Sequence, residues 1–107
     1  MQPHDEALAR TAIGVALIRA TESERRDRLF DDPYARALVD ASGGLPEIAS
    51  RDAANPMVLR MVAQVIVRTR FFDDYLLDAT AEGLRQVVLL AAGLDARAYR
   101  LDLPDGV

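Results

Sequence analysis

Residues 86–101 read QVVLLAAGLDARAYRL, and this stretch decides the fold class that the sequence predicts. Residues 86–91 are mostly apolar and include two adjacent valines, a pattern typical of a buried strand in a parallel sheet. Small residues follow, and Asp95 can then cap a helix over residues 96–101. The stretch therefore predicts a strand, a tight loop and a helix, at the point where the chain enters an α/β domain.

The same strand–loop–helix unit is the strongest candidate for a binding site. A helix N-terminus presents backbone N–H groups that have no partner within the helix. The small side chains of Ala91, Ala92 and Gly93 would let a ligand approach the backbone closely. This geometry suits the carboxylate or the ribose of a nucleotide-like cofactor. The spacing is Ala-x-Gly-x-Asp instead of Gly-x-Gly-x-x-Gly, so a plain turn without a ligand is an equal alternative.

Helices are predicted throughout the chain before this unit. Apolar residues at spacings of three and four predict a helix over residues 5–21, with Asp5 as its cap. Asp32 followed by Pro33 predicts a second helix start, and two glycines end that helix after residue 41.

The longest predicted helix covers residues 57–81. It begins with an Asn55 cap followed by proline and ends at Gly83. Residues 45–54 before it are predicted to form a loop. The apolar stripe expected to pack against the rest of the chain consists of Val58, Val62, Val65, Phe72 and Leu76.

This order of elements predicts two regions: a helical region over residues 1–82 and the start of an incomplete α/β domain over residues 83–107. The chain itself is then mostly α-helical. A single strand has no neighbour to pair with, and buried unpaired N–H and C=O groups are costly. We therefore expect a chain that is cut off just after entering the α/β domain.

Two further clusters could carry chemistry. Arg70 and Asp74 can form a surface pair one helical turn apart, which the residues alone favour over an arginine that binds the carboxylate of an amino-acid-like ligand. Asp31 and Asp32 could serve acid–base chemistry or a metal, but capping by Asp32 already explains them. The aromatic pair at residues 71–72 is expected in the core.

Composition excludes several classes of function. The chain has no cysteine and one histidine, His4, so disulfide scaffolds, thiolate metal sites and histidine clusters are excluded. All basic residues are arginines, and the net charge is −4, which argues against nucleic acid as a partner. The longest apolar run, residues 87–94, is too short for a membrane span, and the N-terminus does not resemble a signal peptide. The expectation is a soluble cytoplasmic protein with no metal site.

Three segments in series carry a resemblance to a known family. They read LFDDPYA at residues 29–35, RTRFFDDYL at residues 68–76 and QVVLLAAGLDARAYRL at residues 86–101. Together they resemble the N-terminal third of the leucine carboxyl methyltransferase-like S-adenosylmethionine-dependent methyltransferases, in the bacterial branch found in mycobacteria and other actinobacteria. The resemblance covers nearly the whole chain, and its last segment is the most specific.

The resemblance implies a Rossmann-like class I methyltransferase fold and S-adenosyl-L-methionine as cofactor. In that family a Gly-x-Gly-type turn after the first strand cradles the cofactor, and an arginine before this turn contacts the cofactor carboxylate. Arg70 matches the arginine, and the first glycine of the turn is replaced by alanine here. The turn itself maps onto Ala91, Ala92, Gly93, Leu94 and Asp95.

The implied activity is methyl transfer to an oxygen or carboxylate of an unknown substrate, and no catalytic residue can be named within the chain. The family's acidic residues that hold the cofactor ribose and adenine would lie beyond Val107. The alternative is therefore a truncated, inactive remnant or a helical interaction module. Exposed strand and helix faces would then favour self-association.

Overall fold

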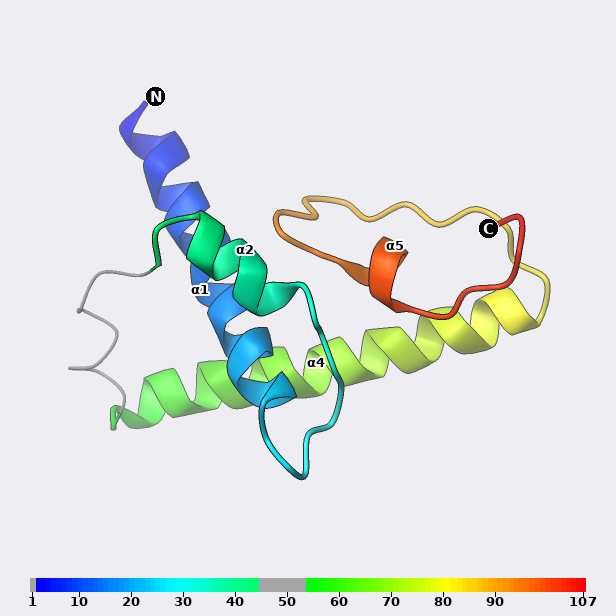
Figure 1. Ribbon diagram of the computed structural model, residues 1–107, viewed down its shortest axis with the longest axis horizontal. Helices are drawn as coiled ribbons and strands as arrows, with labels where there is room; N and C mark the ends of the chain where they lie inside the picture. The colour runs from blue at the N-terminus through cyan, green and yellow to red at the C-terminus, as the bar shows by residue number, and fades with distance from the viewer. Residues whose placement is uncertain (1, 45–53) are drawn as a thin grey trace.

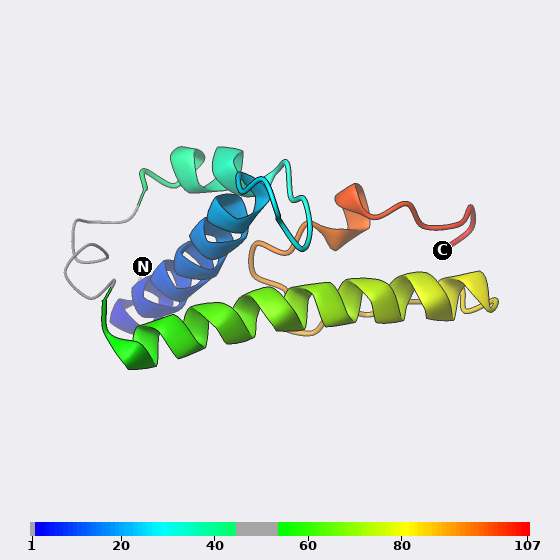
Figure 2. The same ribbon diagram turned by 90° about the horizontal axis from the view of Figure 1, so that it is seen from below.

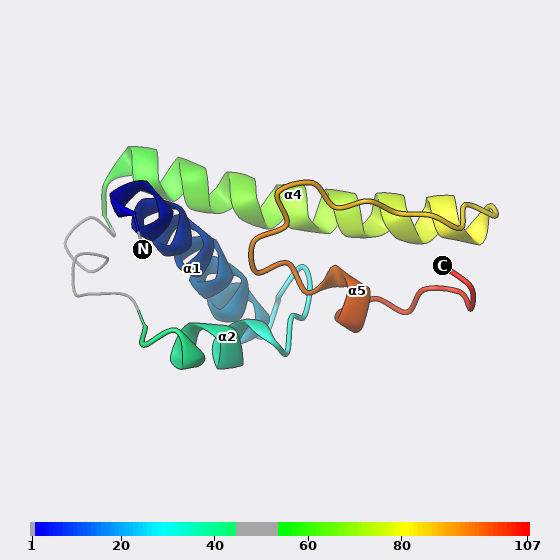
Figure 3. The same cartoon turned by 90° about the horizontal axis from the view of Figure 1, so that it is seen from above.

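The computed structural model of the chain describes residues 2–44 and 54–107, in which helices are joined by turns and irregular segments (Figure 1). The helices are α1 (Pro3–Ser23), α2 (Ala35–Ala41), α4 (Pro56–Ala81) and α5 (Arg97–Arg100). α1 packs against both α2 and α4, and the segment after α4 turns back along that helix (Figures 1 and 3). The prediction of a mostly helical chain is confirmed.

α1 begins earlier than predicted. Its first residue is Pro3, and Asp5 lies within the first turn instead of capping it. The Asp5 carboxylate accepts a hydrogen bond from the backbone N–H of Gln2 at 3.2 Å. The acid therefore still satisfies a backbone donor at the helix start, but from inside the helix.

At the start of α2, the Asp32 side chain accepts hydrogen bonds from the backbone. Its Oδ1 atom accepts hydrogen bonds from the backbone N–H groups of Tyr34 and Ala35, both at 3.1 Å. Pro33 and Tyr34 form a turn, so α2 begins at Ala35 and not at Pro33 as predicted. The prediction of Asp32 as the N-cap is therefore wrong, because the N-cap is Tyr34; the Asp32 carboxylate still accepts from two backbone donors at the helix start.

α4 is the long helix that extends across Figure 2. Its start matches the prediction, because Asn55 Oδ1 accepts a hydrogen bond from the Met57 N–H at 2.9 Å. Gly83, with φ of +114°, follows its end. The predicted apolar stripe is only partly covered: Val65 is buried, whereas Phe72 is exposed. The loop predicted before α4 falls almost entirely outside the described residues.

The strand predicted over residues 86–91 is wrong. No strand occurs in residues 2–44 or 54–107, and residues 86–90 form an irregular segment that lies along α4 (Figures 2 and 3). A strand exists only through hydrogen bonds to a neighbouring strand, and the described part of the chain offers none. An apolar, β-branched sequence cannot supply that partner by itself.

The buried interior is small. Its apolar members are mostly alanines: Ala16, Ala20, Phe30, Ala35, Val39, Val65 and Ala96. Asp32 and Thr80 are the largest fully buried side chains, so polar groups occupy positions where a larger domain would place leucine or phenylalanine. Within residues 2–44 and 54–107, no helix combines the length and apolar character that a bilayer crossing requires.

Candidate functional site

A cleft of about 870 Å³ lies between α1, α4 and the segment that returns along α4. One wall is formed by α1 through residues such as Ala12 and Val15, and a second by α4 through Arg68 and Phe72. The third wall is the segment 87–95, which includes every residue of the loop that the sequence singled out. A cavity of this size is within the range of cofactor-binding sites.

The loop at residues 91–95 winds tightly. Ala91 has φ of +50° and Gly93 has φ of +55°, and the Asp95 N–H donates to the Ala92 carbonyl at 2.9 Å. A Cβ atom added to Gly93 would lie 3.5 Å from Ala12 Cβ, an ordinary contact, so its backbone angle and not crowding requires glycine. The loop thus faces α1 closely across the cleft.

Asp95 ends the loop and begins α5. Its Oδ1 accepts a hydrogen bond from the Arg97 backbone N–H at 2.8 Å, and its Oδ2 pairs with the Arg97 guanidinium. α5 starts at Arg97, one residue later than predicted, so its N-cap is Ala96 and not Asp95, although the Asp95 carboxylate still accepts from the first helical N–H.

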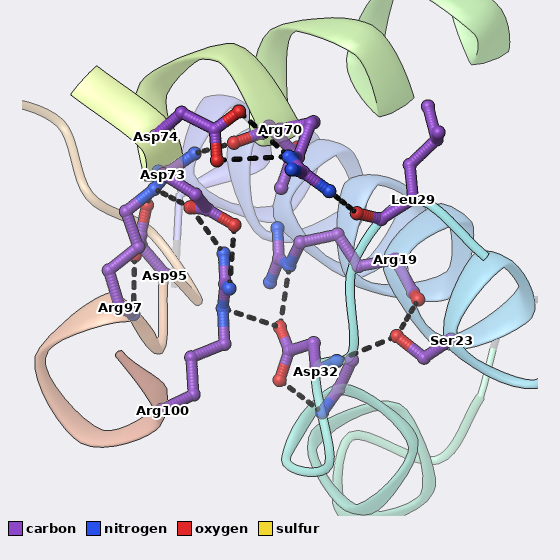
Figure 4. A network of polar contacts seen from close by, with 12 residues as sticks. Arg19, Ser23, Leu29, Asp32, Arg70, Asp73, Asp74, Asp95, Arg97 and Arg100 are labelled. Atoms are coloured by element: carbon purple, nitrogen blue, oxygen red, sulfur yellow. Dashed lines mark hydrogen bonds and ion pairs between the residues drawn. The ribbon is translucent and has the colours of Figure 1, made fainter. Parts of the chain in front are cut away.

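Asp73 lies behind this loop and is almost fully buried. Its two oxygens accept both Nη groups of Arg100 at 2.7 Å, and Oδ1 also accepts from Arg97 Nε at 2.8 Å (Figure 4). The two-pronged contact between guanidinium and carboxylate is the strongest geometry for such a pair. The sequence reasoning assigned no role to Asp73 or to either arginine.

Arg19 on α1 links the same region to the start of α2. Its Nε donates to Asp32 Oδ2 at 3.0 Å (Figure 4). Its Nη2 donates to the Leu94 carbonyl at 2.6 Å. The sequence did carry a signal for Arg19, because it lies one helical turn from Val15 and Ala16 on the apolar side of the predicted helix.

Comparison with known proteins decides the family. Residues 12–107 match the family model described as leucine carboxyl methyltransferase. The chain belongs to the leucine carboxyl methyltransferase family. The family assignment confirms the resemblance drawn from residues 29–35, 68–76 and 86–101.

Among the relatives in this family, a Frankia alni protein is 57% identical over 97 residues, which cover 90% of this chain and 34% of the relative. A Streptomyces coelicolor protein is 51% identical and a Mycobacteroides abscessus protein 50% identical, each over 90% of this chain. All three are named as S-adenosyl-L-methionine-dependent methyltransferases. The chain spans about a third of the length of these relatives.

Arg70, the arginine that the family resemblance assigns to the cofactor carboxylate, does not line the cleft. Its Nε donates to both Asp74 oxygens at 2.8 and 2.9 Å, and its Nη1 donates to the Leu29 carbonyl at 2.8 Å (Figure 4). The hydrogen bond that Arg70 donates to the Asp74 carboxylate raises the pKa of the Arg70 guanidinium. The surface pair predicted from the i,i+4 spacing is therefore present, with the side chain directed away from the loop.

Arg68, two residues earlier on α4, does line the cleft together with the 91–95 loop. Within residues 2–44 and 54–107 it forms no ion pair within 4.0 Å, in contrast to Arg19, Arg97 and Arg100. An arginine without a carboxylate partner at a cleft wall is suited to bind an anion. The helical spacing of α4 did carry a signal for Arg68, because it lies three residues after Val65 and four before Phe72, on the predicted apolar stripe.

The remaining sequence candidates have local roles. Asp31 is exposed, and His4 lies 3.3 Å from Asp5 on the surface. Within the described residues, no group of three histidine, cysteine or acidic side chains is arranged to hold a metal ion. The aromatic pair expected in the core is in fact exposed: Phe71 and Phe72 pack edge to face, and Phe72 lines the cleft.

Proposed function

We propose that this chain supplies part of the S-adenosyl-L-methionine site of a methyltransferase, with the cofactor in the cleft over residues 91–95. One observation carries the proposal: the loop that the family resemblance assigns to the cofactor forms a wall of a cleft of about 870 Å³. Membership of the leucine carboxyl methyltransferase family and the names of the relatives support the same assignment.

The residues of the cleft fit the cofactor. Its amino-acid end carries a carboxylate, and Arg68 offers a guanidinium with no acidic partner among the described residues. The small residues Ala92 and Gly93 leave the loop backbone open to close approach. The apolar surface contributed by Val15, Phe72 and neighbouring residues would exclude water from the bound molecule.

When bound, the cofactor supplies a sulfonium that is already a good methyl donor. The protein's part is then to hold it and to align it with an oxygen or carboxylate nucleophile. The loop and Arg68 bind and orient the amino-acid end in this proposal. No residue of the chain is assigned as a base, and the substrate stays unassigned.

We also propose that residues 83–107 are the start of a Rossmann-like domain, following a helical region over residues 1–82. In this proposal residues 86–91 become a strand when a neighbouring strand is present, since their apolar, valine-containing sequence suits one. The positive φ angles of Ala91 and Gly93 support a tight turn directly after that strand.

A titration of the chain with S-adenosyl-L-methionine, followed by amide chemical shifts, tests the function. We expect shift changes confined to residues 91–95 and the Arg68 region of α4. The variant Arg68→Gln should weaken binding about tenfold or more, the effect expected from losing one charged hydrogen bond. Arg70→Gln on the same helix is the matched control and should leave the affinity within about twofold, because Arg70 lies outside the cleft.

The outcomes of these experiments distinguish whether Arg68, Arg70 or the 91–95 loop binds the cofactor. Loss of affinity in Arg70→Gln but not in Arg68→Gln would restore Arg70 as the carboxylate ligand. Weakened binding in Gly93→Val would support the loop as the binding element, because valine strongly disfavours a φ of +55°. Shifts scattered over the whole chain, or none at millimolar cofactor, would contradict the proposal.

The second candidate is a helical interaction module without catalysis. The observation that favours it is the exposed apolar surface: Val88 is 70% exposed and Leu90 is 87% exposed. Such side chains favour a protein partner or a second copy of the chain. Concentration-dependent association without any cofactor-induced shift would favour this module over the methyltransferase.

A further inference from the structure

We propose that Arg19 and Asp73 are positioning residues for the cofactor loop: they fix residues 91–95 from two sides through one buried network of ion pairs. The identity of the ligand in this inference rests on the proposed function. The network consists of Arg19, Asp32, Asp73, Asp95, Arg97 and Arg100 (Figure 4).

Arg19 fixes the middle of the loop. Its guanidinium is oriented by Asp32, a fully buried carboxylate at the start of α2. The same planar group then donates to the Leu94 carbonyl at 2.6 Å. Because both ends of the guanidinium are engaged, a change in the position of the Leu94 carbonyl would break a buried hydrogen bond.

Asp73 fixes the end of the loop. It accepts from Arg97 Nε at 2.8 Å, and Arg97 in turn pairs with Asp95. The opposite side of Asp73 is occupied by Arg100, whose side chain is 4% exposed. Asp73 thus orients Arg97, and Arg97 pairs with Asp95. Through these contacts α4 restrains the last loop residue, while α1 restrains Leu94.

The charges of the network explain why these residues position the loop and do not bind the cofactor themselves. Its three guanidinium groups face three carboxylates, so it is neutral as a whole. Arg19, Arg97 and Arg100 reach the cleft, but each already donates to an aspartate. Arg100 Nε is buried without a hydrogen bond to residues 2–44 or 54–107 and lies 3.9 Å from Asp32 Oδ2. The loop is the element they present, and Arg68 alone among the cleft arginines lacks an ion pair within the described residues.

Replacing Arg19 by lysine separates positioning from mere stability. Lysine keeps a positive charge beside Asp32, so the buried carboxylate is not left uncompensated. A single ammonium cannot reproduce the planar fork that reaches Asp32 and the Leu94 carbonyl at once. If the role of Arg19 is purely structural, Arg19→Lys should keep the thermal stability, the slow exchange of the loop amides and the cofactor affinity. If Arg19 positions the loop, the variant should keep only the thermal stability.

The experiment compares Arg19→Lys, Arg19→Gln and Asp73→Asn with the wild-type chain. Arg36→Gln is the matched control, because Arg36 donates to Glu24 at 2.8 Å on the exposed surface, away from the loop. Amide hydrogen exchange is measured at Asp95 and Arg97, whose N–H groups donate within the loop. Thermal unfolding and the cofactor titration are recorded on the same samples.

We expect Arg19→Lys to keep most of the wild-type thermal stability while exchange at these two amides rises about tenfold, as for the loss of one charged hydrogen bond. Cofactor affinity should fall by a similar factor. Arg36→Gln should match the wild type in all three measurements. Wild-type exchange rates at both amides in Arg19→Lys would overturn the inference, as would a rise of equal size in the amides of α1.

If Arg19→Gln and Asp73→Asn do not fold, side-chain exchange in the wild-type chain still tests the inference. The Nε–H groups of Arg19 and Arg97 should then exchange much more slowly than that of Arg36; equal rates overturn the inference. A wild-type chain that shows slow loop exchange but no cofactor-induced shift contradicts the proposed function and leaves the positioning of the loop supported. The two proposals can therefore fail separately.

Discussion

Ala91 combines an unfavourable backbone conformation with a place in the candidate cofactor loop. Among the described residues it is the one non-glycine residue with positive φ, at +50°. This conformation costs an L-amino acid roughly 1 kcal/mol, because its Cβ approaches the following carbonyl. The family resemblance places a glycine at this position, and glycine adopts the conformation freely. Alanine therefore keeps the turn but introduces local strain.

Ala91→Gly should leave the free energy of unfolding unchanged or raise it by up to about 1 kcal/mol, because relief of the strain offsets the greater flexibility of the unfolded chain. Ala92→Gly is the control: Ala92 has no positive φ, and the change should lower stability by about 0.5–1 kcal/mol. Urea unfolding measures both. An equal loss in the two variants would mean that Ala91 is not strained.

Asp32 has two roles, and its removal should be severe. The carboxylate accepts from Arg19 and from the first N–H groups of α2, and it is 2% exposed. Asp32→Ala should cost about 3–5 kcal/mol, because it leaves a buried guanidinium uncompensated. The neighbouring Asp31→Ala should cost less than about 0.5 kcal/mol, since Asp31 is exposed. Similar losses in both variants, measured by chemical denaturation, would contradict this role for Asp32.

At the scale of elements, the contrast lies between α4 and the segment that follows it. α4 carries its own cap at Asn55 and satisfies its backbone within the helix, so its hydrogen bonds need no other segment of the chain. Residues 86–90 make no backbone hydrogen bond to any other described residue, and the apolar side chains of this segment are largely exposed. The helix α5 that follows this segment is joined to α4 by the ion pairs of Arg97 and Arg100 with Asp73.

Amide exchange should reflect this contrast directly. We expect amides of residues 86–90 to exchange at nearly the rate of an unstructured peptide, while those in the middle of α4 are protected about a hundredfold or more. Circular dichroism should show helix and no strand contribution. Strong protection at residues 87–89 in the isolated chain would indicate pairing with a second strand, from another copy of the chain.

At the scale of the whole molecule, the chain exposes more surface than its size requires. Its accessible area is 7916 Å², against about 5,900 Å² expected for a folded monomer of this mass. Its radius of gyration is 15.0 Å, against about 13 Å for a compact domain of this length. Large apolar side chains on α4 and along residues 84–90 account for much of the exposed apolar surface.

This surface predicts self-association. Light scattering should show a mass that rises with concentration, because burying apolar area contributes about 25 cal/mol per Å². The double variant Val88→Ser, Leu90→Ser should reduce association and leave the unfolding transition unchanged, since both side chains are already exposed. A wild-type chain that stays monomeric at high concentration would contradict the prediction.

The cofactor affinity of the chain should also be low. The residues of the cleft address the amino-acid end of S-adenosyl-L-methionine, and the chain spans only about a third of its relatives. Losing charged contacts to a ribose costs about 1.5–3 kcal/mol, or one to two decades of affinity. We expect a dissociation constant in the millimolar range and no methyl transfer. Micromolar binding by a monomer, measured by calorimetry, would contradict this expectation.

Local sequence is sufficient to predict the features that depend on neighbouring residues. The helices, the Asn55 cap and the local hydrogen bonds of Asp32 and Asp95 to the backbone could be predicted, because each of these side chains and its backbone partner lie within three residues of each other. The composition of the 91–95 loop and its family resemblance could be read for the same reason: both reside in a short continuous stretch.

Only the tertiary structure decided what depends on residues far apart in the chain. A valine-rich run becomes a strand only beside another strand, and none is present within residues 2–44 and 54–107. Arg68 lies three residues after Val65 and four before Phe72, on the predicted apolar stripe of α4, but only the folded chain shows that this stripe lines a cleft. Arg19 reaches Leu94 across 75 positions of sequence. Buried charges find partners only in the folded chain, because the low dielectric of the interior makes an unpaired charge unfavourable and local periodicity carries no record of the distant partner.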